Sequence, residues 1–292
     1  MIAIRTREIP VPGGAIALEE AGEGPPILLL HGWAMDRRVW APQIEGLADR
    51  HRPIAIDRRG FGRSTAPPDI AREMDDLVEV RRALGLGPMV VVGLSQGGRV
   101  ALRFALDHPE SVLALVLVGA PLDGFAPGPR GEEAIPLSSY AALAQAGRID
   151  RVRALWRRHP LMRGEAGEAR RALDVMLEAY EGRDLAAGAA HELRPIVADL
   201  EAVYAPVLVV TGERDTPWRQ LAGDALAYGL PHGRRARIAG AGHVCSLSQA
   251  AVFNGMVREL VERAETDGAR ATQSRDAKES RPDAIADHKA GY

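Results

Sequence analysis

Short runs of consecutive apolar residues alternate along the chain with longer stretches in which apolar residues recur every three or four positions. The runs lie at residues 25–32, 52–56, 88–93, 111–120, 205–212 and 236–243. Their length and composition are typical of strands buried on both faces of a sheet. The intervening stretches have the spacing of amphipathic helices, at residues 36–50, 74–87, 96–109, 217–230 and 247–264. This alternation predicts an α/β fold with a mostly parallel central sheet and helices on both faces.

The pattern changes at the two ends and in the middle of the chain. Residues 2–9 and 14–22 are predicted to pair as a hairpin around a Pro-Gly-Gly turn. After Pro121 the chain becomes rich in Pro and Gly, and then helical as far as about Leu200 without a buried strand. Within it, apolar side chains repeat at helical spacing at Ala169, Ala172, Leu173, Met176, Leu177 and Tyr180. We interpret this region as a helical insertion that packs on the domain below.

Four segments follow from this pattern. Residues 1–120 and 205–264 are the two parts of one α/β core domain, and residues 121–204 form the helical insertion, called the cap below. The tail, 265–292, holds few large apolar side chains, and we expect it to be disordered because it buries too little surface to offset the entropy of ordering.

Composition excludes several functional classes. The chain has 292 residues, a formal net charge of -2 and a single cysteine, Cys245. The net charge argues against nucleic acid or an anionic membrane as a partner, and one cysteine excludes an internal disulfide and a multi-cysteine metal site. Cys245 is expected to be a small buried hydrophobic residue. No signal peptide or membrane-spanning run is found, which predicts a cytoplasmic protein.

The segment Gly93-Leu94-Ser95-Gln96-Gly97 fits the pattern G-x-S-x-G. An ordinary strand-to-helix turn would also satisfy these five positions, but the motif requires a preceding strand and a following helix, and both are predicted. Glycines two residues either side of Ser95 leave room for a strained turn that exposes the hydroxyl above the strand end. Gly98 would let the helix pack closely on the sheet. Ser95 is therefore a candidate nucleophile.

A serine nucleophile needs a base and an acid, which in this architecture follow it in the order Asp or Glu, then His. Asp215 follows one late strand, and His243 lies in a glycine-rich loop after the next. The pair Asp215 and His243 is therefore predicted to complete the site. Glu213 and Asp123 remain alternative acids. Five other histidines are weaker candidates for the base: His31, His108, His159, His191 and His232.

An oxyanion hole needs two backbone N–H groups that point to the developing negative charge. One is expected from Gln96, directly after the nucleophile. The other is expected from Trp33, in the loop after the strand that ends at Leu30. The Trp33 side chain is also predicted to form a wall of the substrate pocket, together with Trp156 and Tyr140 of the cap.

Taken together, these motifs make the chain resemble the α/β-hydrolase superfamily over nearly all of its length except the tail. The stretches that carry the resemblance are "LLLHGW", "AIDRRGFGRS", "VVVGLSQGGRVAL", "HPESVLALVLVGA", "VLVVTGERD" and "GAGHVCSLSQAAVFN". They look like the branch that holds small esterases, 3-oxoadipate enol-lactonases and cofactor-free haloperoxidase or perhydrolase-type enzymes. The resemblance implies the triad Ser95, Asp215 and His243, and oxyanion donors Trp33 and Gln96. Haloalkane dehalogenases and epoxide hydrolases of this fold have Asp where this chain has Ser95.

The expected function is that of a serine hydrolase that cleaves a small carboxylic ester or lactone through an acyl-enzyme, without a metal or an organic cofactor. Peroxide-dependent perhydrolysis (haloperoxidase-type activity) or hydrolysis of a C–C bond would use the same triad. A non-catalytic receptor for a small ligand is the alternative of another class. Six cap arginines are expected to form a solvated helix face, although one could bind a substrate carboxylate: Arg148, Arg151, Arg153, Arg157, Arg158 and Arg163. Met162 and Tyr180 are as well explained by packing as by a pocket. The sequence gives no indication of an oligomeric state.

Overall fold

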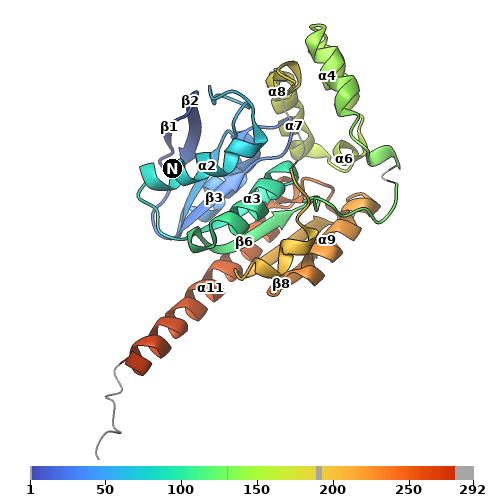
Figure 1. The fold of residues 1–292 in the computed structure, drawn as a ribbon. Coiled ribbons are helices and arrows are strands. Elements are labelled where there is room, and N and C mark those ends of the chain that lie inside the picture. Colours follow the sequence, from blue (N-terminus) through green and yellow to red (C-terminus); the bar gives the residue numbers. More distant parts are fainter. Residues whose placement is uncertain (1, 130, 189–192, 280–292) are drawn as a thin grey trace, which may run out of the picture.

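The computed structural model describes residues 2–129, 131–188 and 193–279, the stretch after residue 266 by its backbone alone. Within this part of the chain, eight strands form one sheet in the order β1-β2-β4-β3-β5-β6-β7-β8 (Figure 1). Their bounds are Arg5–Val11 (β1), Gly14–Glu20 (β2), Pro26–Leu30 (β3), Arg52–Ile56 (β4), Met89–Leu94 (β5), Val112–Val118 (β6), Val207–Gly212 (β7) and Gly233–Ile238 (β8).

The sheet is mostly parallel, as predicted. Strands β3 to β8 pair in parallel, whereas the hairpin of β1 and β2 is antiparallel and joins the sheet where β2 meets β4. Parallel strands need a crossover between them, and the helices that make these crossovers cover the sheet. The carboxyl ends of β3 and β5 to β8 therefore meet along one edge, where open α/β sheets place their ligands.

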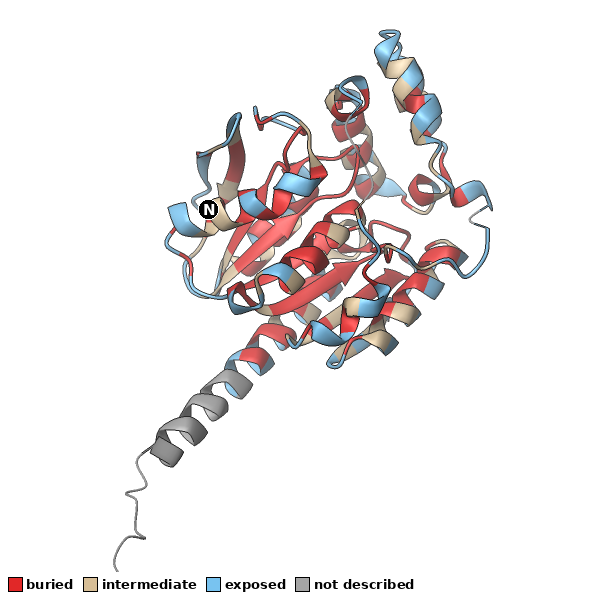
Figure 2. Ribbon diagram, viewed as in Figure 1, coloured by how far each residue is buried: buried red, intermediate tan, exposed pale blue. Residues whose placement is uncertain are grey.

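Helices pack on both faces of the sheet. Apolar residues of α1 (Ala41–Leu47) and α11 (Ala250–Glu279) belong to the core on one face. Those of α2 (Glu73–Ala83), α3 (Gln96–Asp107) and α9 (Pro217–Gly229) belong to the core on the other. The central strands, such as β5 and β6, are almost wholly buried (Figure 2), which explains why their sequences are continuous apolar runs rather than alternating ones.

The cap lies between β6 and β7 and is helical, as the sequence predicted. It contains α4 (Leu137–Gln145), α5 (Ile149–Trp156), α6 (Pro160–Arg163), α7 (Gly167–Ala179), α8 (Arg183–Ala186) and the 3-10 helix η5 (Val197–Ala202). Figure 1 shows α4, α7 and α8 projecting at the upper right. The apolar stripe of α7 is buried, apart from the partly buried Ala172, and joins the same core as Trp33.

The C-terminal region differs from the expectation of disorder from Glu265. A short helix, α10 (Cys245–Ser248), precedes α11, and α11 continues to Glu279. Buried Phe253, Val257 and Val261 anchor the first half of α11. The residues after Ala264 include several good helix formers, and an already nucleated helix can extend through such residues. Residues 280–292, with His288, lie outside the described residues.

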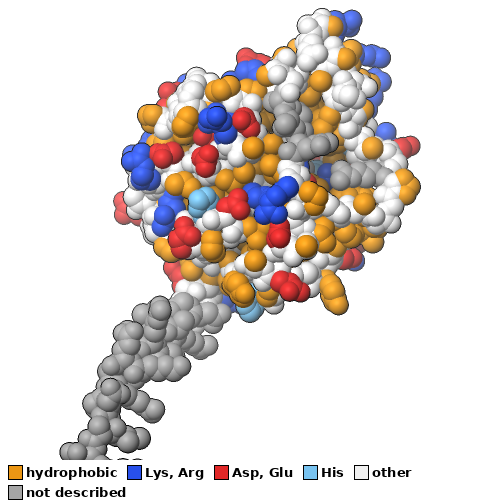
Figure 3. Space-filling model, viewed as in Figure 1, with side chains coloured by type: hydrophobic (Ala, Val, Ile, Leu, Met, Phe, Trp, Pro, Cys, Tyr) orange, Lys and Arg blue, Asp and Glu red, His pale blue; other side chains and the backbone are white. Residues whose placement is uncertain are grey.

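Charged side chains of both signs are mixed with apolar ones on the face of the molecule in Figure 3. Among the helices built by the described residues, none combines the length and the apolar character that a membrane crossing requires.

Candidate active site

Ser95 lies at the turn between β5 and α3 and has an unusual backbone conformation. Its φ of 51° and ψ of -115° fall outside the regions that L residues commonly occupy. Strain of this kind costs on the order of 1–3 kcal/mol and persists only where the surroundings enforce it. Here the Ser95 N–H donates to the Val118 carbonyl oxygen at 2.7 Å, which ties the turn to β6. The candidate nucleophile is thus held in a fixed, strained turn.

The glycines around Ser95 are required by close backbone contacts. A Cβ added at Gly93 would lie 2.4 Å from the Gly97 carbonyl oxygen, and one added at Gly97 would lie 2.4 Å from that of Leu30. A Cβ at Gly98 would lie 2.6 Å from the Ala120 Cβ. These distances show that α3 approaches the sheet so closely that no side chain fits at the three positions.

Asp215 and His243 form a buried pair at the neighbouring strand ends. The His243 Nδ1 atom lies 3.1 Å from Oδ1 and 3.0 Å from Oδ2 of Asp215, and both residues are more than nine-tenths buried. The Thr216 N–H also donates to Asp215 Oδ1, at 2.8 Å. A carboxylate on Nδ1 favours the tautomer whose proton sits there, so Nε2 carries the lone pair. Among the described residues, His243 Nε2 has no hydrogen-bond partner.

Gly119, which the sequence reasoning missed, makes room for this pair. It directly follows β6 with a φ of +53°, and a Cβ there would lie 2.8 Å from Nδ1 and Cε1 of His243. The same Cβ would lie 3.2 Å from Asp215 Oδ2. Gly119 therefore meets both a conformational and a steric requirement. Its position directly after a buried strand was the only signal in the sequence.

The alternative acids have other partners. Asp123 Oδ1 accepts a hydrogen bond from Arg99 Nε at 2.8 Å, and Glu213 Oε2 accepts one from the Gly240 N–H at 2.8 Å. The structure thus places Asp215, rather than either alternative, against the His243 ring.

The other histidines are used structurally or lie elsewhere. His31 Nε2 accepts the Arg58 N–H at 2.9 Å, and burial lowers the pKa of His31 to about 3. His159 stacks on Trp156 in the cap, and burial lowers its pKa to about 4. His108 ends α3 and His232 lies in the turn before β8. His191 lies outside the described residues.

The loop after β3 runs beside Ser95. A Cβ added at Gly32 would lie 3.5 Å from the Ser95 Cβ, which places the start of this loop against the candidate nucleophile. Ala34 has a φ of 57°, so the loop turns sharply after Trp33. Gln96 is the first residue of α3, where backbone N–H groups have no acceptor within the helix. Trp33 follows Gly32 directly and Gln96 follows Ser95 directly, so the two predicted oxyanion donors belong to the two segments next to Ser95.

Arg58, which the sequence reasoning also missed, connects the loop after β3 to the start of α3. Its guanidinium donates to the His31 carbonyl oxygen at 3.0 Å and to Gln96 Oε1 at 3.0 Å. It also forms a buried ion pair with Glu73, whose carboxylate it meets through two nitrogens at 2.7 and 2.9 Å. Only the glycine-rich context of "DRRGFG" marked this region in the sequence. A buried guanidinium with these partners holds the two segments in register.

Ser95 and His243 open into one cavity of about 470 Å³ beneath the cap. Trp33 and Trp156 line it, whereas Tyr140 does not line it and instead stacks on Trp33 at a centroid distance of 6.0 Å. The remaining walls come from both domains: Met35, Gln96, Arg99, Pro121, Asp123, Gly124, Ile135, Leu137, Leu193, Pro195 and Arg219. The cavity has the size and mixed lining typical of small-molecule sites.

The arginines near this cavity are engaged in ion pairs. Arg99 binds Asp123, and Arg219 Nε lies 2.9 Å from Glu133 Oε1. The six cap arginines singled out in the sequence do not line the cavity. Several of them bind other cap groups, as when Arg157 pairs with Asp174. Met162 and Tyr180 are likewise buried outside the cavity wall.

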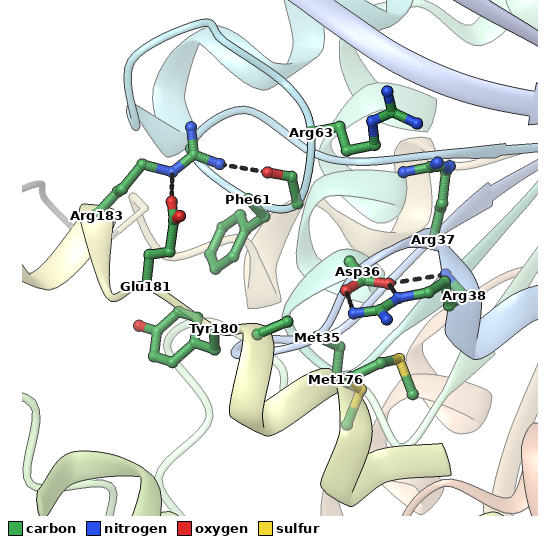
Figure 4. A pocket seen from close by; sticks show the side chains of 13 residues that line it. Met35, Asp36, Arg37, Arg38, Phe61, Arg63, Met176, Tyr180, Glu181 and Arg183 are labelled. Atoms are coloured by element: carbon green, nitrogen blue, oxygen red, sulfur yellow. Dashed lines mark hydrogen bonds and ion pairs between the residues drawn. The ribbon is translucent and has the colours of Figure 1, made fainter. Parts of the chain in front are cut away.

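A second cavity, of about 300 Å³, lies where the cap meets the core (Figure 4). It shares Met35 with the first cavity but contains neither Ser95 nor His243. Most of its charged side chains bind one another or backbone oxygens: Arg38 pairs with Asp36, and Arg183 pairs with Glu181.

Within the described part of the chain, no cluster of His, Cys, Asp and Glu has the arrangement of a metal site. Burial raises the pKa of the Cys245 thiol, which suits a packed rather than a reactive cysteine.

Comparison with known proteins agrees with this architecture. Residues 25–249 match the family model described as "alpha/beta hydrolase fold". The chain is 30% identical to the pimeloyl-[acyl-carrier protein] methyl ester esterase of Nitrosomonas europaea, over 80% of this chain and 94% of the relative. It is 32% identical to the putative carbamate hydrolase RutD of Variovorax paradoxus, over 84% of this chain and 95% of the relative.

Solved structures are similar over most of the chain. An esterase from Thermogutta terrifontis superposes with a TM-score of 0.74 at 26% identity, covering 89% of this chain and 99% of the other. Est816, described as an N-acyl homoserine lactone degrading enzyme, superposes with a TM-score of 0.72 at 28% identity, covering 87% and 99%.

Proposed function

Because the chain belongs to the alpha/beta hydrolase fold family, we propose that it is a serine hydrolase of small carboxylic esters or lactones. The observation that carries the proposal is the arrangement at one cavity. Ser95 stands on a strained turn, and the buried Asp215–His243 pair leaves Nε2 without a partner among the described residues. The similarity to proteins named as esterases and as a lactone-degrading enzyme supports the same reaction class.

In the first half-reaction, His243 Nε2 takes the proton of the Ser95 hydroxyl while Oγ attacks the substrate carbonyl carbon. The Asp215 carboxylate holds the imidazole in the required tautomer and stabilises its cation. The carbonyl oxygen becomes an oxyanion, which accepts hydrogen bonds from the backbone N–H groups of Trp33 and Gln96. The loss of one such donor typically costs about 3–4 kcal/mol of barrier.

Collapse of this intermediate breaks the bond to the leaving alcohol, which receives the proton from His243. Water then enters, gives a proton to His243, and its oxygen attacks the acyl-enzyme carbonyl. The second intermediate releases the carboxylic acid and restores the Ser95 hydroxyl. For a lactone, alcohol and acid leave as one molecule. No step calls for a metal ion or an organic cofactor.

The cavity wall favours uncharged substrates of modest size. Its two arginines are paired with Asp123 and Glu133, so a substrate carboxylate would have to compete with a protein carboxylate for either guanidinium. The side chains of Ile135 and Leu137 offer apolar surface to an acyl chain. A short-chain neutral ester or lactone fits these walls better than a dicarboxylate.

A panel of p-nitrophenyl esters and N-acyl lactones of increasing chain length tests the proposal. The wild type is expected to turn over short members and to be labelled at Ser95 by a fluorophosphonate. Ser95→Ala is expected to lose both activities while its melting temperature changes little, because alanine keeps the Cβ and so the same backbone strain at this position. Ser111→Ala, a buried serine far from the cavity wall, is the matched control and should keep full activity.

Three outcomes would contradict the proposal. Unchanged turnover in Ser95→Ala would exclude Ser95 as the nucleophile. Tight binding of esters or lactones by the wild type without product release would indicate a receptor. Product formation only when acetate and peroxide are supplied would indicate a perhydrolase.

A further inference from the structure

A buried carboxylate of the cap binds the side chain of Trp33. Asp184 lies in α8 with 2% of its surface exposed, and its Oδ2 accepts a hydrogen bond from Trp33 Nε1 at 2.7 Å. Its Oδ1 accepts a second one from the Tyr180 hydroxyl at 2.6 Å. Burial and the neighbouring Asp184 charge raise the pKa of Tyr180 well above its usual value, so this hydroxyl keeps its proton.

The Trp33 indole is enclosed by aromatic rings of the cap. It stacks on Tyr140, and the rings of Trp156 and Tyr180 meet it edge-on at centroid distances of 4.7 and 5.8 Å. Trp33 belongs to the core loop after β3, yet its side chain is 4% exposed and inserted into the cap. The position of Trp33 is thus set by the cap as well as by the sheet.

A second cap carboxylate binds the loop that carries His243. Glu165, between α6 and α7, accepts a hydrogen bond from the Val244 N–H at 2.8 Å and is 6% exposed. The backbones are in contact there, since a Cβ added at Gly164 would lie 2.8 Å from the Gly242 Cα. Two glycines therefore allow the cap chain to reach the residue that follows the candidate base.

The residue before Asp184 fixes α8 to the core. The Arg183 guanidinium donates to the carbonyl oxygens of Gly62 at 2.7 Å and Ser64 at 2.8 Å. In Figure 4 the Arg183 side chain reaches across from α8 to this core loop. Arg183 and Asp184 thus bind two different core loops from one short helix.

We propose that Asp184 and Glu165 are positioning residues of the reaction. Through them, the docked cap holds the loop that carries Trp33 and the loop that carries His243 in the geometry that catalysis requires. The inference rests on the proposed function, in which Trp33 supplies an oxyanion donor and His243 the base. Both contacts break if the cap lifts from the core.

The test removes each acceptor and compares the result with the loss of a more exposed cap carboxylate that binds only other cap residues. Asp184→Leu and Glu165→Met remove the two contacts. Asp174→Leu and Glu178→Met on α7 are the controls, since both carboxylates pair with Arg157. We expect kcat to fall about 10- to 100-fold in the first two, with KM within about threefold, and to stay unchanged in the controls.

Conservative variants separate a positioning contact from cap stability. Gln at position 165 still offers an oxygen to the Val244 N–H, so Glu165→Gln should recover most of the activity that Glu165→Met loses. Asp184→Asn keeps one acceptor and should be intermediate. A trifluoromethyl ketone, which forms an oxyanion on Ser95, should lose affinity by the same factor as kcat/KM, whereas the product acid should bind as before.

Hydrogen–deuterium exchange in the resting protein tests the same contacts without turnover. Residues 31–36 should exchange faster in Asp184→Leu, and residues 241–245 faster in Glu165→Met, with neither change in the controls. Faster exchange together with an unchanged kcat would overturn the inference, as would an equal loss of kcat in the controls. If the variants exchange faster as expected but the wild type hydrolyses no ester, the result would instead contradict the proposed function. If Asp184→Leu fails to fold, Trp33→Phe removes the same hydrogen bond from the other side and decides the question.

Discussion

Gly119→Ala should damage the candidate site through a single methyl group. The added Cβ would lie 2.8 Å from Nδ1 and Cε1 of His243, whereas ordinary contacts begin at 3.4 Å. The ring must therefore move, by about 0.6 Å to reach ordinary contact, and Asp215 Oδ2, at 3.2 Å from the same carbon, blocks part of that movement. Misplacement on the scale of 1 Å can cost about 100-fold in rate, so we expect kcat to fall between about 10- and 100-fold.

The variant also carries a backbone cost that must be separated from this effect. At a φ of +53°, an L residue costs about 1–2 kcal/mol relative to glycine. Gly85→Ala is the matched control, because Gly85 has a φ of +63° and a Cβ there would meet nothing within 4 Å. Both variants should lose similar stability, and only Gly119→Ala should lose activity.

Steady-state kinetics on a short p-nitrophenyl ester, together with urea unfolding, measures both quantities. KM should change little, because Gly119 does not line the cavity. The reasoning would be refuted if Gly119→Ala kept the wild-type kcat with the fold intact. It would also be refuted if Gly85→Ala lost as much activity as Gly119→Ala.

Two further predictions concern the acid and the buried histidines. Asp215→Asn should lower kcat by up to about 10⁴-fold, because an amide no longer holds His243 in the required tautomer, whereas Asp123→Asn should lower kcat far less. Steady-state kinetics of both variants checks this. The reverse ranking would make Asp123 the acid. The lowered pKa values of His31 and His159, about 3 and 4 against about 6.5 when unfolded, mean that the unfolded chain binds the extra protons. The free energy of unfolding should therefore fall as the pH drops below about 6.5, and between pH 6.5 and 5 this dependence should be shallower in His159→Gln by up to about 1.4 kcal/mol per pH unit. Equal slopes in urea titrations of the two proteins would show that His159 takes up its proton equally in both states.

The sheet and the positions of the candidate chemical groups were accessible from sequence because they depend on local pattern. Apolar runs marked the buried strands, and the parallel arrangement brings their carboxyl ends to one edge. Ser95, Asp215 and His243 each follow such a run, so their meeting could be predicted without any knowledge of side-chain packing. Their chemical roles remain a proposal that the kinetic experiments address.

Contacts between distant segments were not accessible in the same way. Trp33 and Asp184 are 151 positions apart, and Val244 and Glu165 are 79 apart. Nothing in a run such as "GRDLA" distinguishes a buried aspartate that binds an indole from a solvated one. Tyr140 shows the same limit, since its apolar ring was assigned to the pocket and packs behind Trp33 instead.

The insertion of Trp33 into the cap bears on how freely caps can be exchanged between related proteins. In the sequence, the cap is a continuous block that could be excised and replaced. In space, it contains the acceptor for a core indole and the acceptor for a core amide. A chimera that received a foreign cap without an equivalent of Asp184 would leave the Trp33 N–H buried and unpaired. A graft should therefore carry equivalents of Asp184 and Glu165, because these two carboxylates bind the core loops that hold Trp33 and His243.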